Sequence, residues 1–365
     1  MGILEKIKEI EDEMRRTQKN KATEHHLGRL KGKLAALRAE LLAPPKASAK
    51  GEGFDVGKHG DARVALVGFP SVGKSTLLSE MTETASDAAA YAFTTVTAIP
   101  GNIYHHGATI QLLDLPGILE GAAYGRGRGR QVIAAARTSD LILLMLDATK
   151  GDIQKELLLN ELYLVGLRIN KKPANVTITI KDKGGVSFNS TVPQTTLETK
   201  LVRDILKDQK INNAEVSAHE DVTVEDFIDA LHIRHRKYVP CLFVYNKIDQ
   251  LVIEEVDRLA RLPNTVVISS GQKWNLDYLL EKMWEALDLI RVYTKRRGDD
   301  PNLAEALVLS RDRCTVQWVC RSIHKDFEKG FRYAWVWGRS AKHSPQKVGL
   351  SHELQDEDVI ELVRV

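Results

Sequence analysis

Residues 62–81 read ARVALVGFPSVGKSTLLSEM, and their pattern predicts the architecture of the surrounding domain. It opens with a near-continuous apolar run, passes through a glycine-containing turn and continues as a helical pattern. The turn, Gly68 to Ser75, matches the P-loop pattern G-x-x-x-x-G-K-[ST] in the strand–turn–helix context that the motif requires. Backbone amides of such a loop hold phosphate groups at the amino-terminal end of the helix. The stretch therefore predicts an α/β domain with a phosphate site.

Two side chains of this loop have distinct expected roles. Lys74 is expected to place its ammonium group against the β- and γ-phosphate oxygens, which makes it a candidate catalytic residue. Ser75 is expected to offer its hydroxyl to Mg²⁺, which prefers hard oxygen ligands in octahedral geometry. The residues expected to contact the phosphates are Gly68, Phe69, Pro70, Ser71, Val72, Gly73, Lys74, Ser75 and Thr76.

A second motif, DLPG, follows the apolar run TIQLL. Asp114 is placed to hold Mg²⁺, and the Gly117 amide is placed to reach the γ-phosphate, so Gly117 is a second candidate catalytic residue. The residues expected to contact the nucleotide here are Asp114, Leu115, Pro116, Gly117 and Ile118.

The segment YAFTTVTAIPG, residues 91–101, separates the two motifs. A threonine in this interval would bind Mg²⁺ only while the γ-phosphate is present, which would order the segment as a switch. Thr94, Thr95 and Thr97 all qualify, and the pattern alone leaves the choice open.

A third motif predicts which nucleotide base the site binds. NKID follows the apolar run CLFVY, and the Asp249 carboxylate can accept hydrogen bonds from the ring NH and the amino group of guanine. Adenine lacks that pair of donors, and sites built this way reject the wrong analogue by about 10⁴-fold. The motif therefore favours a GTPase over the main alternative, a P-loop ATPase. Asn246 is expected to bridge to the P-loop, and Lys247 to lie over the base. The backbone amides of the SSG segment are expected to face the guanine oxygen. The residues expected around the base are Asn246, Lys247, Ile248, Asp249, Ser269, Ser270 and Gly271.

The pattern of apolar runs divides the chain into parts. Residues 1–45 predict a helical hairpin that turns near residues 19–23, and residues 46–60 are a linker rich in Pro, Gly, Ser and Lys. Residues 61–168 and 239–290 alternate strands with helices, which is typical of a parallel sheet covered on both faces.

Two further parts complete the chain. Residues 169–238 predict an inserted α+β subdomain, with a β-hairpin over residues 175–192 that turns near Gly184 and Gly185, and helices over 197–208 and 223–231. Residues 291–365 predict a small mixed sheet around one helix. Trp318, Trp335 and Trp337 are expected in its core.

The amino-acid composition limits the classes of function that the chain can have. The 365 residues are 43% hydrophobic and 28% charged, and the net charge of +3 is too small to imply a nucleic-acid partner by itself. Three cysteines are an odd number, which favours a reducing compartment over a disulfide framework. The start MGILEKIKEIEDEM is charged within five residues, unlike a signal peptide or membrane anchor. We therefore expect a cytoplasmic protein with no membrane partner and no DNA partner.

Several segments outside these motifs resemble one family. RTQKNKATEHHLGRLKGKLAALRAELL, QLLDLPGILEGAAYGRGRGRQVIAAART and YAWVWGRSAKHSPQKVGL are similar to the developmentally regulated GTP-binding (DRG) proteins of the Obg-like GTPases. MGILEKI and MLDATKGDIQ resemble the second of the two subtypes. The resemblance implies a P-loop GTPase domain with an α+β insertion, an N-terminal helical hairpin and a C-terminal TGS domain of the β-grasp type. It also implies action on translating ribosomes with a DRG family regulatory protein, and it selects Thr95 as the Mg²⁺ ligand.

One position departs from many GTPases. Ile118 occupies the place directly after the DLPG glycine where a glutamine often orients the attacking water, and an apolar side chain cannot hydrogen-bond that water. We therefore expect slow intrinsic hydrolysis, on the order of 10⁻⁴–10⁻² s⁻¹. Ser71 stands where cation-dependent relatives have Asn, which leaves a role for K⁺ open. Glu120 is a weaker catalytic candidate.

Basic side chains gather in two segments. Eight Lys and Arg lie between Arg15 and Arg38 against one acid, Glu24, and could contact ribosomal RNA phosphates; the alternative is a solvated helix face. Arg126, Arg128 and Arg130 alternate with glycines after DLPG. The leading hypothesis is a slow, ribosome-associated GTPase. The alternatives are a scaffold that GTP stabilises and a cytoskeletal or trafficking regulator.

Overall fold

The computed structural model describes residues 3–42, 60–82, 99–115, 136–151 and 153–364. The chain forms two compact units, which are described separately: residues 1–55, 117–137 and 152–239, and residues 56–116, 138–151 and 240–365. The first unit thus joins the N-terminal hairpin with the insertion, which the sequence treats as separate parts. Among the described residues, no helix has both the length and the apolar character needed to cross a bilayer.

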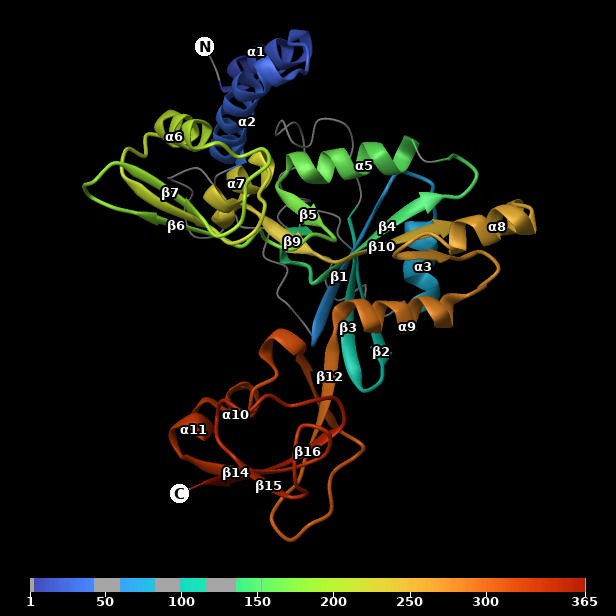
Figure 1. The fold of residues 1–365 in the computed structure, drawn as a ribbon. Helices are drawn as coiled ribbons and strands as arrows, with labels where there is room; N and C mark the ends of the chain where they lie inside the picture. Colours follow the sequence, from blue (N-terminus) through green and yellow to red (C-terminus); the bar gives the residue numbers. More distant parts are fainter. Residues whose placement is uncertain (1–2, 43–59, 83–98, 116–135, 152, 365) are drawn as a thin grey trace, which may run out of the picture. The chain divides into compact units, whose positions relative to one another are not determined.

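The second unit contains a six-stranded sheet that carries the P-loop (Figure 1). Its strand order is β11-β10-β4-β1-β3-β2, in which only β2 runs antiparallel to its neighbour. Every residue of β1 and β4 is buried, as expected for parallel strands covered on both faces. The strands are β1 Ala62–Gly68, β2 Ile99–His105, β3 Ala108–Asp114, β4 Leu141–Asp147, β10 Cys241–Asn246 and β11 Thr265–Val267.

The helices of this part are α3 Lys74–Met81, α8 Ile253–Ala260 and α9 Leu276–Leu287, with the short helix η4 Ile248–Gln250. Leu77 of α3 and Met283 of α9 share a buried cluster with alternate residues of the central strands, such as Leu66 and Leu143. Truncating one of these leucines to alanine would cost about 2–5 kcal/mol, so this cluster fixes the strand ends on which the site is built.

The C-terminal part of the same unit is a five-stranded mixed sheet of order β13-β12-β16-β14-β15. Strands β12 and β16 pair in parallel and the other pairs are antiparallel, in agreement with the predicted β-grasp fold. Val316, Val319 and Cys320 of α10 are buried against it. The elements are β12 Leu289–Thr294, β13 Ala306–Ser310, η5 Arg311–Arg313, α10 Val316–Ile323, α11 Lys325–Lys329, β14 Phe331–Trp337, β15 Gln346–Val348 and β16 Asp358–Arg364.

The expectation that the C-terminal tryptophans form the core is wrong. Ala334 and Val336 of β14 are the buried residues, and Trp335 and Trp337 alternate with them on the opposite face, half-buried. Trp318 is also half-buried, and the guanidinium groups of Arg313 and Arg321 lie 5.0 and 5.3 Å from its ring centroid. The inner face of this sheet, which also includes Ile290, Val292 and Ile360, shares one buried cluster with α10.

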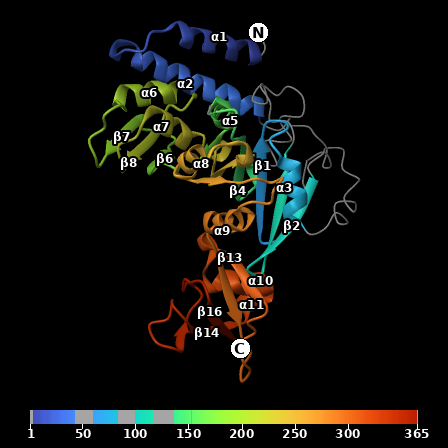
Figure 2. The ribbon, with the colours of Figure 1, turned by 90° about the vertical axis from the view of Figure 1, so that its right-hand side faces the viewer.

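In the first unit, the N-terminal helices α1 Ile3–Arg16 and α2 Lys21–Leu42 form the predicted hairpin, and α2 packs on the insertion (Figure 2). Gly28 and Gly32 allow this approach, because an added Cβ would lie 3.2 Å from Leu201 and 3.3 Å from Ile205. The remaining elements are α5 Ile153–Leu164, β5 Leu167–Ile169, β6 Val176–Ile180, β7 Val186–Ser190, α6 Thr199–Asp208, β8 Ala214–Ala218, α7 Val224–Leu231, η3 Ile233–His235 and β9 Lys237–Val239.

The predicted hairpin over residues 175–192 is wrong. Strands β6 and β7 lie where the pattern predicts strands, but β8 lies between them and pairs antiparallel with β6 and parallel with β7. Ala214, Val216 and Ala218 of β8 are fully buried against α6 and α7, whereas the two edge strands are mostly exposed. Burial of the central strand outweighs the local turn signal. The helices expected over 197–208 and 223–231 are α6 and α7.

Candidate nucleotide-binding site

The candidate site lies at the carboxyl ends of the parallel strands of the second unit. Strands β1, β3, β4 and β10 end in Gly68, Asp114, Asp147 and Asn246, respectively. Ligands of open α/β sheets bind outside this edge, where the order of strands changes direction. The chain leaves β1 toward β3 on one side and later reaches β4 on the other.

The P-loop has a backbone that tolerates few substitutions. Gly73 has φ 95°, and a Cβ built there would lie 2.3 Å from Asn246 Nδ2. A Cβ on Gly68 would lie 2.6 Å from the Met145 carbonyl oxygen, which is backbone and cannot give way. Ser71 also adopts a positive φ, 64°. Pro70, Ser71, Ser75 and Thr76 are exposed, whereas Val72 and Lys74 are buried and Phe69 is half-buried.

Lys74 folds back over its own loop. Its Nζ donates hydrogen bonds to the carbonyl oxygens of Gly68, at 3.0 Å, and Phe69, at 2.9 Å. Burial lowers the pKa of Lys74, while the nearby Asp114 carboxylate acts in the opposite direction. A charged ammonium held on neutral carbonyls at the start of α3 is suited to receive phosphate oxygens.

Ser75 and Asp114 make an oxygen pair beside the loop. The Ser75 hydroxyl donates to Asp114 Oδ2 at 3.0 Å. Within the described residues, the buried Asp114 Oδ1 has no hydrogen-bond partner. A carboxylate oxygen left without a partner next to a hydroxyl fits Mg²⁺, which binds through one or two protein oxygens and keeps waters or phosphates in its other positions. Thr95, Pro116, Gly117 and Ile118 lie outside the described residues; Leu115 is buried.

Asn246 connects the phosphate loop to the loop after β11. Its Nδ2 donates to the Val72 carbonyl oxygen at 2.8 Å and to Ser270 Oγ at 2.8 Å. Its Oδ1 accepts from the Ser270 amide at 2.9 Å. One buried side chain therefore fixes the distance between the two loops that would hold the two ends of a nucleotide.

The base-side residues gather around Asp249. Its side chain is exposed, and its Oδ1 accepts a hydrogen bond of 2.6 Å from the Ser269 hydroxyl, which orients the carboxylate. Ser269 and Ser270 are buried and Gly271 is exposed at the end of this loop. The arrangement leaves carboxylate lone pairs free to accept from the guanine edge. Ile248 is half-buried beside it.

Asp147 is a site residue that the sequence reasoning did not include. Its Oδ2 accepts from Lys247 Nζ at 2.7 Å, and its Oδ1 accepts from the Thr149 hydroxyl. Burial alone would raise the pKa of Asp147, but these bonds outweigh it and the pKa is lowered. Asp147 thereby fixes the side chain of Lys247, the residue that the NKID motif predicts to lie over the base. The sequence does contain a feature that could have identified Asp147. It is a charged residue at the end of the apolar run LILLMLD, as Asp114 is at the end of TIQLLD.

The second unit combines a P-loop whose serine is hydrogen-bonded to an aspartate, an NKID motif at the end of a strand, and a C-terminal sheet of the β-grasp type. Together these features define a GTPase with a TGS domain. Residues 63–181 match the family described as "50S ribosome-binding GTPase", residues 183–289 match the "C-terminal region of MMR_HSR1 domain", and residues 290–364 match the TGS domain. Developmentally-regulated GTP-binding protein 2 of mouse is 62% identical over 365 residues, and that of human is 61% identical, with both chains fully covered in each case. GTP-binding protein 1 of fission yeast is 58% identical over 364 residues, covering all of this chain and 99% of that one.

The chain belongs to the family of developmentally regulated GTP-binding proteins. It is therefore a GTP-binding protein of a GTP-hydrolysing class, as the motifs predict.

Proposed function

We propose that this protein is a slow GTPase whose nucleotide state controls its association with cytoplasmic ribosomes, together with a DRG family regulatory protein. The matching GTPase family is described as ribosome-binding, which supports a ribosomal partner. The observation that carries the proposal is the outer face of the C-terminal sheet, where aromatic and basic side chains meet.

That face presents Tyr333, Trp335 and Trp337 from β14, all half-buried. Lys347 Nζ lies 4.2 Å from the Tyr333 ring centroid, and Lys295 Nζ lies 5.1 Å from that of Trp337. Aromatic rings that stack on bases, flanked by cations that meet phosphates, are the usual means of binding single-stranded RNA. The face therefore suits exposed nucleotides of ribosomal RNA.

The N-terminal hairpin offers a smaller basic surface than its sequence suggests. Arg29 pairs with Asp208 at 3.0 Å, Lys31 with Glu225 at 2.7 Å, and Arg38 with Glu11 at 2.6 Å, all within the first unit. These three cations hold the hairpin together and onto the insertion. Of the eight basic residues between Arg15 and Arg38, the exposed ones are Arg15, Arg16, Lys19, Lys21 and Lys33, and RNA contact by this segment would depend on these five.

Lys74 and the residues around Mg²⁺ would carry the chemistry. Mg²⁺ held by Ser75, Asp114 and Thr95 would neutralise charge on the transferring phosphoryl group. Lys74 would leave its carbonyl partners and bind the β- and γ-phosphate oxygens, and the Gly117 amide would hold the γ-phosphate. Because Ile118 cannot orient water, hydrolysis would be slow, and K⁺ or a ribosomal group would complete the site.

Sedimentation with ribosomes tests the proposal. Purified protein is sedimented with GTP, with GDP and without nucleotide, with and without the regulatory partner, and hydrolysis is measured in K⁺ and in Na⁺. Binding that depends on GTP and weakens in Trp335→Ala supports the proposal. Binding independent of nucleotide would favour a scaffold, and no binding would favour a cytoskeletal or trafficking role.

A further inference from the structure

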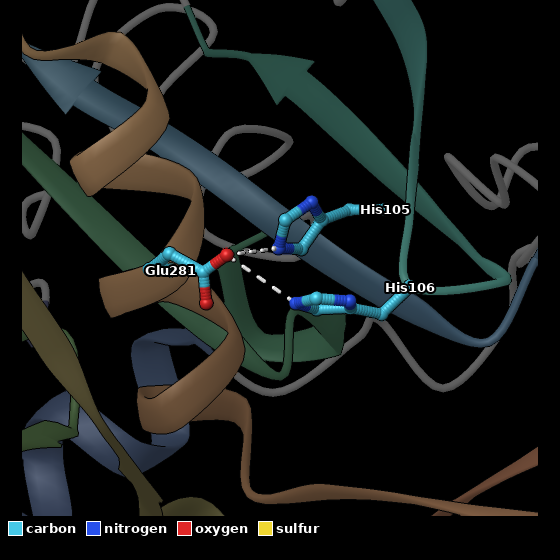
Figure 3. A group of neighbouring side chains, drawn as sticks. All are labelled: His105, His106 and Glu281. Atoms are coloured by element: carbon cyan, nitrogen blue, oxygen red, sulfur yellow. Dashed lines mark ion pairs between the residues drawn. The ribbon is translucent and has the colours of Figure 1, made fainter.

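Two neighbouring histidines share one side of the turn between β2 and β3. His105 is the last residue of β2, and the turn is made by His106, φ 50°, and Gly107, φ 79°. Positive φ at both central residues is the type I′ turn of two-residue hairpins. Successive side chains of a strand point to opposite faces, but this turn brings the two imidazole rings together, with centroids 4.0 Å apart. Figure 3 shows both rings directed at the same carboxylate.

That carboxylate belongs to Glu281 of α9, in the same unit. Its Oε1 lies 3.4 Å from His105 Nε2 and 3.3 Å from His106 Nε2. The three candidate ligand atoms all lie within 4.8 Å of one another. Zinc–nitrogen and zinc–oxygen bonds of about 2.0–2.1 Å in a tetrahedron separate neighbouring ligand atoms by about 3.3–3.4 Å. Both histidine–carboxylate distances fall at that value.

We propose that His105, His106 and Glu281 form a Zn²⁺ site with one open position. Two imidazoles and one carboxylate are a ligand set that zinc uses, with water or a further ligand in the fourth position. The ion would tie the turn of the β2–β3 hairpin to α9. The nearest alternative is a simple ion pair between the carboxylate and a protonated histidine.

The geometry favours a shared ion over that pair. Hydrogen bonds between these groups have heavy-atom distances of about 2.7–3.2 Å, shorter than both contacts here. His105 Nε2 is buried, and its 3.4 Å contact with Glu281 Oε1 lacks the geometry of a hydrogen bond. A buried nitrogen without a well-formed hydrogen bond is costly, and a metal ion between the three groups would satisfy it together with the other two.

An aromatic side chain packs beside the two histidines. Trp284, one turn along α9, meets His106 edge-on at 5.2 Å and His105 at 6.1 Å between centroids. The His105 side chain is 17% exposed, whereas those of His106 and Glu281 are 38% and 52% exposed, so an ion has an entry path. The three side chains therefore have an aromatic ring beside them and remain accessible to solvent.

Zinc titration of the full chain, purified without a polyhistidine tag, tests the site. A colorimetric chelator competes for Zn²⁺ while excess Mg²⁺ and GDP occupy the P-loop. We expect one Zn²⁺ per chain, and Co²⁺ in its place should show the visible absorption of a tetrahedral site.

Two variants remove one ligand each. His106→Asn retains a residue that type I′ turns favour, so the hairpin stays folded. Glu281→Gln keeps the shape of an exposed side chain. Loss of an outer-shell partner already lowers metal affinity 10–100-fold, so either variant should lose at least about 100-fold and the cobalt absorption. His343→Ala, at an exposed position, is the control and should bind as the unaltered chain does. The proposal is overturned if the unaltered chain binds no Zn²⁺, or if both variants bind it as tightly as the control.

Discussion

Replacing Asn246 by alanine removes a buried side chain that joins the P-loop to the loop after β11. The variant leaves the buried Val72 carbonyl and the Ser270 amide without their partner, which they contact at 2.8 and 2.9 Å. A buried polar group without a hydrogen bond costs about 1–3 kcal/mol. The two together give roughly 2–6 kcal/mol, so we expect the free energy of unfolding to fall by about 3 kcal/mol, since a water can enter the space.

The same variant should bind guanine nucleotides at least tenfold more weakly, equivalent to about 1.4 kcal/mol, because binding must then order two unconnected loops. Urea unfolding followed by tryptophan fluorescence measures the first quantity, and titration with a fluorescent GDP analogue measures the second. Asn212→Ala, at an exposed position, is the control and should change stability by less than about 0.5 kcal/mol. A loss below about 1 kcal/mol with unchanged nucleotide affinity would refute this account of Asn246.

The remaining predictions concern the charges of the site. Lys74→Ala should abolish productive GTP binding, and unaltered single-turnover hydrolysis would contradict its assignment. Ser75→Asn should lose Mg²⁺-dependent GTP binding because it replaces a hydroxyl ligand, which a titration with and without Mg²⁺ would show. Asp249→Asn should shift base preference from guanine to xanthine, and an unchanged GTP affinity in competition assays would remove Asp249 from this role. The folded-state pKa of Asp147 is lowered, so its stabilising contribution is present above its unfolded pKa of about 3.9 and is lost as pH falls below that value. Asp147→Asn should therefore be less stable at neutral pH and show a shallower loss of stability between about pH 5 and 2; parallel acid-unfolding curves for variant and unaltered chain would exclude that contribution.

Local signals predicted the framework of the site well. The strands around the P-loop are buried on both faces, so their apolar runs are continuous and unambiguous. Asp114 and Asn246, the first residues of DLPG and NKID, stand at the ends of two of these strands. The positions of Asp114 and Asn246 therefore followed from order along the chain.

Long-range pairing was beyond such signals. The glycines at 184–185 suggested a hairpin, but the placement of β8 between β6 and β7 depends on residues about 30 positions further along. In YAWVWG, large and small side chains alternate, which predicts that they lie on opposite faces of a strand. The pattern does not show which face α10 covers, so the core was assigned to the tryptophans instead of Ala334 and Val336. The ion-pair partners of Arg29 and Lys31 in the insertion could not be predicted either, because they lie far away along the chain.

The packing of α2 on the insertion has a consequence for synthesis. Arg29 and its partner Asp208 are 179 positions apart in the chain. At translation rates of about 5–20 residues per second, roughly 10 to 35 seconds pass between the appearance of one and of the other. During that time Leu30 and Leu34, which are buried in the finished unit, lack the part of the insertion on which α2 packs. We therefore expect the apolar side chains of α2 to be exposed early in synthesis, until the insertion has been made.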